Sequence, residues 1–185
     1  MKILSLLLTC LFLMSGCSSH NNAMDQALSI RSRLNESGCE FYAQIIADYG
    51  EYTHAFEMEC SVDEAGKLVF TVLKPETING ISGFFEAGAG KLTFDDKLLA
   101  FSPLSEGLLT PVAAPWVFLS ALKGGYMSCA GEYDGGYRIQ IDDTYEDCSL
   151  MLDVLTDRDA RPVSAEIYWD GRRIVCMRID NFKMM

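Results

Sequence analysis

The sequence predicts an α+β domain in which an antiparallel sheet of about eleven strands is preceded by one helix and interrupted by another. Three observations predict this class. An amphipathic segment with a period of 3.6 opens the part that follows an apolar N-terminus. The period then changes to 2 for most of the chain, and one apolar segment with helix boundaries interrupts the run of short strands.

The first sixteen residues, MKILSLLLTCLFLMSG, predict a secretion signal. They carry one charge, at Lys2, and their apolar run is shorter than the roughly 20 residues that a membrane-spanning helix needs. The tetrapeptide Met14-Ser15-Gly16-Cys17 resembles a bacterial lipobox. That resemblance implies a diacylglyceryl thioether on Cys17 and a mature chain that begins there. The alternative is an ordinary signal peptide cleaved nearby, with Cys17 an incidental thiol.

Three parts follow from this cleavage point: a lipoprotein signal peptide over 1–16, a lipidated tether over 17–23 and one folded domain over 24–185. The tether is polar, so we expect it to act as a flexible spacer. Two acyl chains, with a third on the amine, would anchor a protein stably to a membrane. We therefore expect an exported protein on the outer leaflet of the cytoplasmic membrane, or on an outer membrane if the cell has one.

The charge of the chain excludes one class of partner. The chain holds 26 acidic against 15 basic residues, which gives a formal net charge of −11. Such a charge repels phosphate backbones and anionic headgroups alike. We therefore expect no nucleic acid partner, and we expect membrane attachment to depend on the lipid rather than on a basic patch.

Two segments predict helices. In MDQALSIRSRLNESG, from Met24 to Gly38, apolar residues recur at helical spacing and the glycine marks the end. In PWVFLSALKGG, over 115–125, a proline stands in the first turn and two glycines stand at the end. The apolar residues of the second segment, Trp116 and Phe118 among them, exceed a single helix stripe. We therefore expect this helix to lie against the apolar face of the sheet.

Elsewhere apolar residues recur with a period of 2, and turn sequences such as EAG, DGG and DG separate short apolar runs. Consecutive strands joined by hairpins form an antiparallel meander. The predicted strands are 39–48, 52–62, 67–74, 80–86, 90–95, 97–101, 126–133, 137–142, 148–155, 162–169 and 172–182.

A two-residue loop at Tyr49-Gly50 predicts the register of the first hairpin, in which Asp48 faces Glu51. This register places apolar side chains of both strands on one face and charged side chains on the other. It also places Cys39 directly opposite Cys60. Because an exported protein folds in an oxidising compartment, we predict a disulfide between them, with two buried thiols as the alternative.

The order of these elements resembles that of the LolA and LolB lipoprotein carriers and their relatives. The shared order is an N-terminal helix, eleven antiparallel strands and an apolar helix inserted after the sixth strand. The most specific match is KLVFTVLKPETI, which is similar to a family strand that ends in a basic residue, a proline, two variable residues and an apolar or aromatic residue. Here these are Lys74, Pro75 and Ile78, where the carriers have arginine at the first position and phenylalanine at the last. The segment WDGRRIVCMRIDNFK is similar to their closing turn and strand.

The resemblance implies a strongly bent sheet, an open half-barrel, with the inserted helix on its concave side. A curved sheet cannot fill its own concave side, which must hold helices, an apolar guest, or both. We therefore expect a membrane-anchored protein that binds a lipid or the acyl chains of a lipoprotein, in a carrier or acceptor role. The alternative is an envelope sensor or regulatory protein that uses the same scaffold to bind another protein. The residues expected to contact the guest are Phe41, Ile45, Phe56, Met58, Lys74, Ile78, Trp116, Phe118, Tyr137, Ile139, Leu150 and Leu152.

No enzyme chemistry is expected from this sequence. His54 is the one histidine within the predicted domain, and acyl transfer requires a nucleophile with a base and an orienting partner. The acidic residues Asp142, Asp143, Glu146 and Asp147 lack the spacing of a calcium-binding loop and fit a solvated hairpin better. We expect no cofactor and no metal site.

Overall fold

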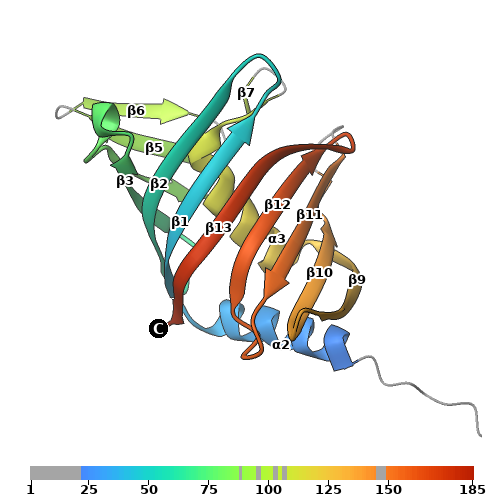
Figure 1. Ribbon diagram of the computed structural model, residues 1–185. Coiled ribbons are helices and arrows are strands. Elements are labelled where there is room, and N and C mark those ends of the chain that lie inside the picture. The colour runs from blue at the N-terminus through green and yellow to red at the C-terminus, as the bar shows by residue number, and fades with distance from the viewer. Residues whose placement is uncertain (1–21, 88, 95–96, 102–103, 106–107, 145–148) are drawn as a thin grey trace, which may run out of the picture.

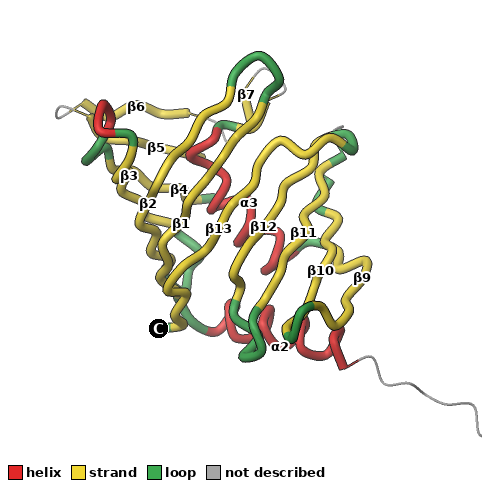
Figure 2. Tube along the Cα trace, viewed as in Figure 1, coloured by secondary structure: helices red, strands yellow, loops and turns green. Residues whose placement is uncertain are grey.

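The computed structural model describes residues 22–87, 89–94, 97–101, 104–105, 108–144 and 149–185. Figures 1 and 2 show their arrangement. The predicted signal peptide, the predicted lipidation site Cys17 and most of the predicted tether lie outside these residues. Cys148, Glu146 and Asp147 lie outside them as well.

Eleven strands form one antiparallel sheet, which is strongly bent and open (Figure 1). Their order across the sheet is β6-β5-β4-β3-β2-β1-β13-β12-β11-β10-β9, so β6 and β9 are its edges. The strands are β1 (Cys39–Asp48), β2 (Thr53–Val62), β3 (Leu68–Lys74), β4 (Ser82–Glu86), β5 (Ala89–Phe94), β6 (Lys97–Phe101), β9 (Tyr126–Tyr133), β10 (Gly136–Asp142), β11 (Leu150–Thr156), β12 (Pro162–Trp169) and β13 (Arg172–Met184). The predicted eleven-stranded half-barrel is confirmed.

The sheet consists of two meanders rather than the single one that we predicted. Strands β1 to β6 form one and strands β9 to β13 form the other. The two are joined where β1 pairs with β13, the first strand with the last. The single meander is wrong because the last strand returns to the middle of the sheet instead of ending at its edge.

Two helices cover the concave side and one end of the sheet. Helix α2 (Asn22–Glu36) buries Ala23, Ala27, Ile30 and Leu34, which recur every three or four residues along one face. Helix α3 (Ala114–Gly124) lies on the concave side, as predicted, and packs near β10, β12 and α2 (Figures 1 and 2). Helix α2 also lies near β9 and β10. Two 3-10 turns, η1 (Glu76–Ile78) and η2 (Pro111–Ala113), and the hairpin of β7 (Leu104–Ser105) and β8 (Leu108–Leu109) were not predicted from the sequence.

The first hairpin has a four-residue loop, so its predicted register is wrong by two residues. Asp48 pairs with Thr53 rather than with Glu51. The backbone N–H of Tyr49 donates to the carbonyl of Tyr52 at 3.0 Å, and the Asp48 carboxylate accepts from the N–H of Gly50 at 2.8 Å. Since side chains alternate with a period of 2, a shift of two residues preserves the faces while changing every partner.

The inner face of the sheet and the two helices share one apolar core. Alternate residues of the strands are buried on this side, for example Met58, Phe70, Ile139 and Val154. Residues of α2 and α3 belong to the same cluster. The helices therefore occupy most of the space that a half-barrel leaves on its concave side.

Candidate functional site

Most residues that we predicted to contact a guest lie in this core. From the sheet, six of them are buried: Phe41, Ile45, Met58, Ile139, Leu150 and Leu152. Phe118 of α3 is fully buried as well. These side chains pack against one another and against residues of α2 and α3, which belong to the same apolar core.

Aromatic rings connect α3 to the first meander. The ring of Phe118 meets that of Phe41 edge to face, with centroids 6.2 Å apart. The ring of Trp116 stacks on that of Phe85 on β4, with centroids 5.9 Å apart. These contacts pack the first half of α3 against the inner face, and offset or edge contacts of this kind are favourable for aromatic pairs.

Several apolar residues of the first meander, of η1 and of the segment around the start of α3 are only partly buried. Three of them are predicted contact residues that pack against the core: Phe56 on β2, Ile78 in η1 and Trp116 in the first turn of α3. Ile81, Leu92 and Val112 behave in the same way. We call these six residues the rim. Tyr137 is also partly buried but lies on β10, across the sheet from the rim.

Helix α3 is held differently at its two ends. At its C-terminal end, the guanidinium of Arg31 on α2 donates to the carbonyl oxygens of Leu122, at 2.8 Å, and of Gly125. Burial lowers the pKa of Arg31, and the nearby Asp143 carboxylate opposes this shift. Before its N-terminal end, the Tyr49 hydroxyl donates to the carbonyl of Leu109. Charged donors thus hold one end, while a neutral hydroxyl holds the segment that leads into the other.

Lys74 does not join the predicted contact residues, because its side chain is on the outer face. It is 59% exposed and donates to the Glu57 carboxylate at 3.0 Å. Glu57 also accepts a hydrogen bond from the hydroxyl of Tyr42. Lys74 and Ile78 match the same family motif, yet one lies in this outer network and the other in the rim.

The outer network shifts the acidity of its members. Hydrogen bonds from Tyr42 and then from Lys74 lower the pKa of the Glu57 carboxyl. Burial and the bond to Glu57 raise the pKa of Tyr42 to about 12. Burial alone raises the pKa of Tyr49, near α3, to about 12. All three groups therefore keep their ordinary neutral-pH charges, Glu57 ionised and both tyrosines protonated.

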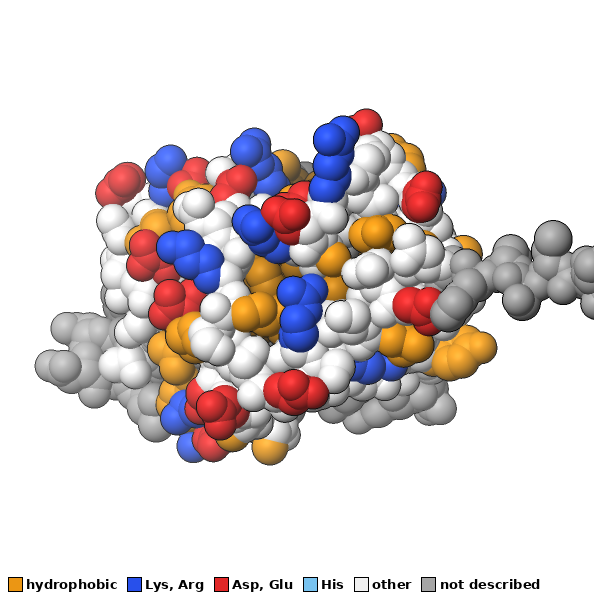
Figure 3. Space-filling model, turned by 90° about the horizontal axis from the view of Figure 1, so that it is seen from below, with side chains coloured by type: hydrophobic (Ala, Val, Ile, Leu, Met, Phe, Trp, Pro, Cys, Tyr) orange, Lys and Arg blue, Asp and Glu red, His pale blue; other side chains and the backbone are white. Residues whose placement is uncertain are grey.

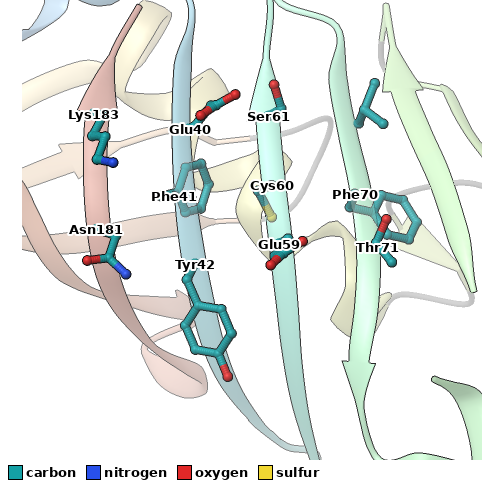
Figure 4. Close-up of a pocket in the computed structure, with 11 residues that line it drawn as sticks. Glu40, Phe41, Tyr42, Glu59, Cys60, Ser61, Phe70, Thr71, Asn181 and Lys183 are labelled. Carbon is teal, nitrogen blue, oxygen red and sulfur yellow. The ribbon is translucent and has the colours of Figure 1, made fainter. Parts of the chain in front are cut away.

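The outer face also carries two grooves that the sequence analysis did not predict. One, of about 460 Å³, is lined by residues of β13, β1, β2 and β3, including Tyr42, Glu59 and Thr71 (Figure 4). The other, of about 540 Å³, is lined by residues that include Ile46, Lys74 and Phe56. The sequence does contain one signal of these grooves, namely apolar residues at strand positions that face outward. Ile46 and Val69 are such residues, and they are 52% and 47% exposed.

The predicted disulfide between Cys39 and Cys60 is absent, and both thiols are free and buried. The four-residue loop places Cys39 opposite Val62 and Cys60 opposite Phe41, so the two cysteines are diagonal rather than direct neighbours. Burial raises the pKa of Cys39 to about 12 and raises that of Cys60 further. Cys129 and Cys176 are free and exposed.

Within the described residues, no group of three or more His, Cys, Asp or Glu side chains is placed to hold a metal ion. Among the same residues, no helix is long and apolar enough to cross a membrane. His54 is exposed, and its ring lies between those of Tyr49 and Phe56, at 6.4 and 6.3 Å.

Several solved structures are similar to this chain. An uncharacterized conserved protein from Thermus thermophilus is 12% identical, with a TM-score of 0.51 over 89% of this chain and 88% of that one. A domain described as an outer membrane lipoprotein-sorting protein, from Vibrio parahaemolyticus, is 10% identical, with a TM-score of 0.50 over 88% and 92%. A LolA superfamily protein from Nitrosomonas europaea is 7% identical, with a TM-score of 0.45 over 86% and 93%.

These similarities concern the fold. The first two structures match this chain over most of both lengths, so the predicted resemblance to LolA-like half-barrels is confirmed at the level of the fold. No protein-family model and no curated protein matches the sequence.

Proposed function

We propose that this protein is a membrane-anchored lipoprotein that binds a lipid, or the acyl chains of a lipoprotein, between the inner face of the sheet and α3. It acts as a carrier or acceptor in the cell envelope and not as an enzyme. The observation that carries the proposal is the rim, a set of apolar side chains that pack against the apolar core and are only partly buried. The lipoprotein-sorting description of the similar Vibrio domain agrees with it.

The chemistry of the interior suits an acyl chain. Its members next to the rim, such as Phe70, Val72 and Phe85, are apolar and buried. Each methylene that leaves water for such surroundings contributes about 0.8 kcal/mol. A chain of ordinary length therefore retains useful affinity after the entropic costs of binding and of opening the protein are subtracted.

Entry of a chain requires movement of α3, and the two ends of this helix differ in how they are held. The charged bonds from Arg31 retain the C-terminal end, whereas the hydroxyl of Tyr49 holds the segment before the N-terminal end. We infer that the first turns of α3, with Trp116, move away from Phe85 while Arg31 keeps the last turn in place. The guest then lies where Trp116 packs on Phe85 and Phe118 packs on Phe41.

The test changes the hydrogen bond that holds the moving end. In the domain of residues 22–185, Tyr49→Phe removes one bond to a carbonyl, worth about 1 kcal/mol, so the open form becomes about fivefold more populated and fatty acid binds about fivefold more tightly. Tyr52→Phe is the matched control, because Tyr52 is 66% exposed and in the same loop. Calorimetric titration with a long-chain fatty acid measures both. Equal affinities for wild type and Tyr49→Phe would contradict the proposed movement of the first turns of α3. No binding to either protein would contradict the proposed function.

A second candidate function, that of an envelope sensor which binds another protein, is favoured by the outer grooves. Val69 and Ile46 expose apolar surface in these grooves, beside charged residues such as Glu59 and Glu57. Ile46→Asp distinguishes the two functions. A carrier tolerates this change, because Ile46 lies outside the interior. A sensor loses its cellular effect while lipid binding by the purified domain is unchanged.

A further inference from the structure

Three basic residues are among those that line a pocket at the end of the sheet where α2 lies. The pocket has a volume of about 380 Å³. Arg33 comes from α2, Arg161 from the turn between β11 and β12, and Lys183 from the end of β13. The remaining lining residues are apolar: Ala160, Phe182 and Met184. Figure 1 shows these three elements meeting beside the C-terminus, and Figure 3 shows basic side chains around apolar surface on this end of the molecule.

Two of the three cations have no ion pair among the described residues. Arg161 pairs with Asp159 at 2.6 Å, and both side chains are more than half exposed. Lys183 lies opposite Glu40 on β1 without forming a salt bridge to it, and Arg33 forms none either. A pocket with unpaired cations stands out in a chain whose formal net charge is −11.

The pocket lies on the end of the protein that the anchor would hold close to the membrane. This step rests on the proposed function, because it takes Cys17 as lipidated. Asn22, where α2 begins, is five residue steps after Cys17, and an extended chain spans at most about 3.6 Å per residue. The start of α2 therefore stays within about 18 Å of the bilayer surface. Helix α2 runs along the same end as the pocket (Figure 1).

We propose that this pocket binds the phosphate group of an anionic phospholipid at the membrane surface. Arg33, Arg161 and Lys183 bind the phosphate oxygens, with the arginines as bidentate donors and the lysine as a point charge. The glycerol backbone lies on Phe182 and Met184. Phosphate competes with Asp159 for Arg161, and exchange is easy because that ion pair is exposed to water.

The apolar floor favours a lipid headgroup over free phosphate. Phe182 is buried, and its ring stacks on that of Phe41 at 5.8 Å, so the floor is fixed by the core. A fully hydrated anion gains nothing from such a floor, whereas the glycerol carbons of a lipid do. The site orients the domain on its own membrane and does not overlap the rim, which lies along β2, β5 and the start of α3.

The experiment measures how fast Lys183 is acetylated by an amine-reactive ester. The full chain is placed in nonionic detergent micelles that contain phosphatidylglycerol, or phosphatidylcholine at the same molar fraction. Peptide mass spectrometry compares Lys183 with Lys91, an exposed lysine on β5 away from the pocket. We expect phosphatidylglycerol to slow the acetylation of Lys183 relative to Lys91, and phosphatidylcholine to leave the ratio unchanged. Higher salt weakens the protection.

Variants test the assignment of the pocket. Each basic residue near an anionic surface contributes about a fivefold preference, so Arg33→Gln with Arg161→Gln should raise the phosphatidylglycerol concentration that half-protects Lys183 by about 25-fold. Arg172→Gln with Arg178→Gln removes the same charge from exposed positions elsewhere on β13 and should leave protection intact. Circular dichroism checks that both double variants are folded.

Three results would overturn the proposal: equal protection by phosphatidylcholine, protection that survives in Arg33→Gln with Arg161→Gln, or equal protection by inorganic phosphate without lipid. The last would identify a free-phosphate site instead. Mass spectrometry of the intact protein tests the anchor separately, because a chain without acyl groups on Cys17 has a lower mass. The micelles present the headgroup to the pocket whether or not that anchor exists.

Discussion

At the scale of single residues, the outer network of Tyr42, Glu57 and Lys74 makes a pH-dependent contribution to stability. The pKa of Glu57 is lowered by its two donors, so its contribution is present above its ordinary pKa and is lost as the pH falls through the lowered value. The pKa of Tyr42 is raised to about 12, so its contribution is present below the ordinary tyrosine pKa and is lost as the pH rises toward 12.

We expect Tyr42→Phe to raise the pKa of Glu57, because the hydroxyl is the largest cause of its shift. Carboxyl NMR titration of the wild type and the variant measures the change. Tyr52→Phe, which removes an exposed hydroxyl of the loop, is the control and should leave the pKa unchanged. An unchanged Glu57 pKa in Tyr42→Phe would mean that the hydrogen bond does not form in solution.

The cysteines divide into two classes by burial. At mildly alkaline pH we expect iodoacetamide to modify Cys129 and Cys176 in the folded protein, because both are exposed. Cys39 and Cys60 should react only after denaturation, because burial raises their pKa values and denies access. Peptide mapping without reductant reads all four sites. If Cys39 and Cys60 stay unmodified in denaturant until reductant is added, they are bonded and the free thiols described here are wrong.

At the scale of elements, local turn chemistry predicted most strand boundaries, since hairpin loops are read from a few neighbouring residues. Strands β1, β6, β9 and β12 begin and end where we predicted. The loop from Tyr49 to Tyr52 was harder, because Tyr49-Gly50 fits a two-residue loop while the Asp48 carboxylate stabilises a longer one. The pairing of β1 with β13 joins residues far apart in the sequence, and no local pattern reports such a pairing.

The candidate site was predicted in part. Period 2 identified the inner face correctly, so Phe41, Ile45 and Met58 do lie on the concave side. Their role depends on how completely the helices cover that side, which is a property of packing and not of local sequence. Lys74 was misplaced because a bulge between Glu57 and Met58 interrupts the alternation where β2 pairs with β3.

The hydrogen bonds from Arg31 to the end of α3 should stabilise the fold. Arg31→Gln removes a charged donor from two carbonyls at the end of α3, and hydrogen bonds to charged groups contribute about 1.5–3 kcal/mol each. We therefore expect a loss of about 3 kcal/mol in the free energy of unfolding, measured with urea. Arg33→Gln, on the exposed side of the same helix, should change it by less than about 0.5 kcal/mol. Equal effects of both variants would show that Arg31 does not hold α3.

At the scale of the whole molecule, an acidic body needs an anchor to remain at a membrane. Its net charge of −11 opposes association with anionic headgroups. Lipidation at Cys17 would overcome this repulsion and place α2 next to the bilayer. The same geometry leaves the rim and the outer grooves free to meet other molecules.

We expect Cys17→Ala to lose its acyl groups, so that mature protein no longer accumulates in the membrane fraction. Wild-type protein should resist extraction by high salt and dissolve in detergent, because its attachment is apolar. Cys129→Ala is the control, since that thiol lies on an edge strand of the domain. Membrane retention of processed Cys17→Ala after a salt wash would contradict a single anchor.

The most direct test of the account is contact between an acyl chain and Trp116. Bromine quenches indole fluorescence only at short range, so brominated stearate is added to the domain of residues 22–185 carrying Trp169→Phe, in which Trp116 is the sole tryptophan. The account predicts saturable quenching that unlabelled stearate reverses and that Phe56→Asp weakens without loss of circular dichroism. Trp116→Phe, which retains only Trp169, should show little quenching. Absence of saturable quenching at Trp116, or quenching equal to that at Trp169, would contradict an acyl-chain site beneath α3.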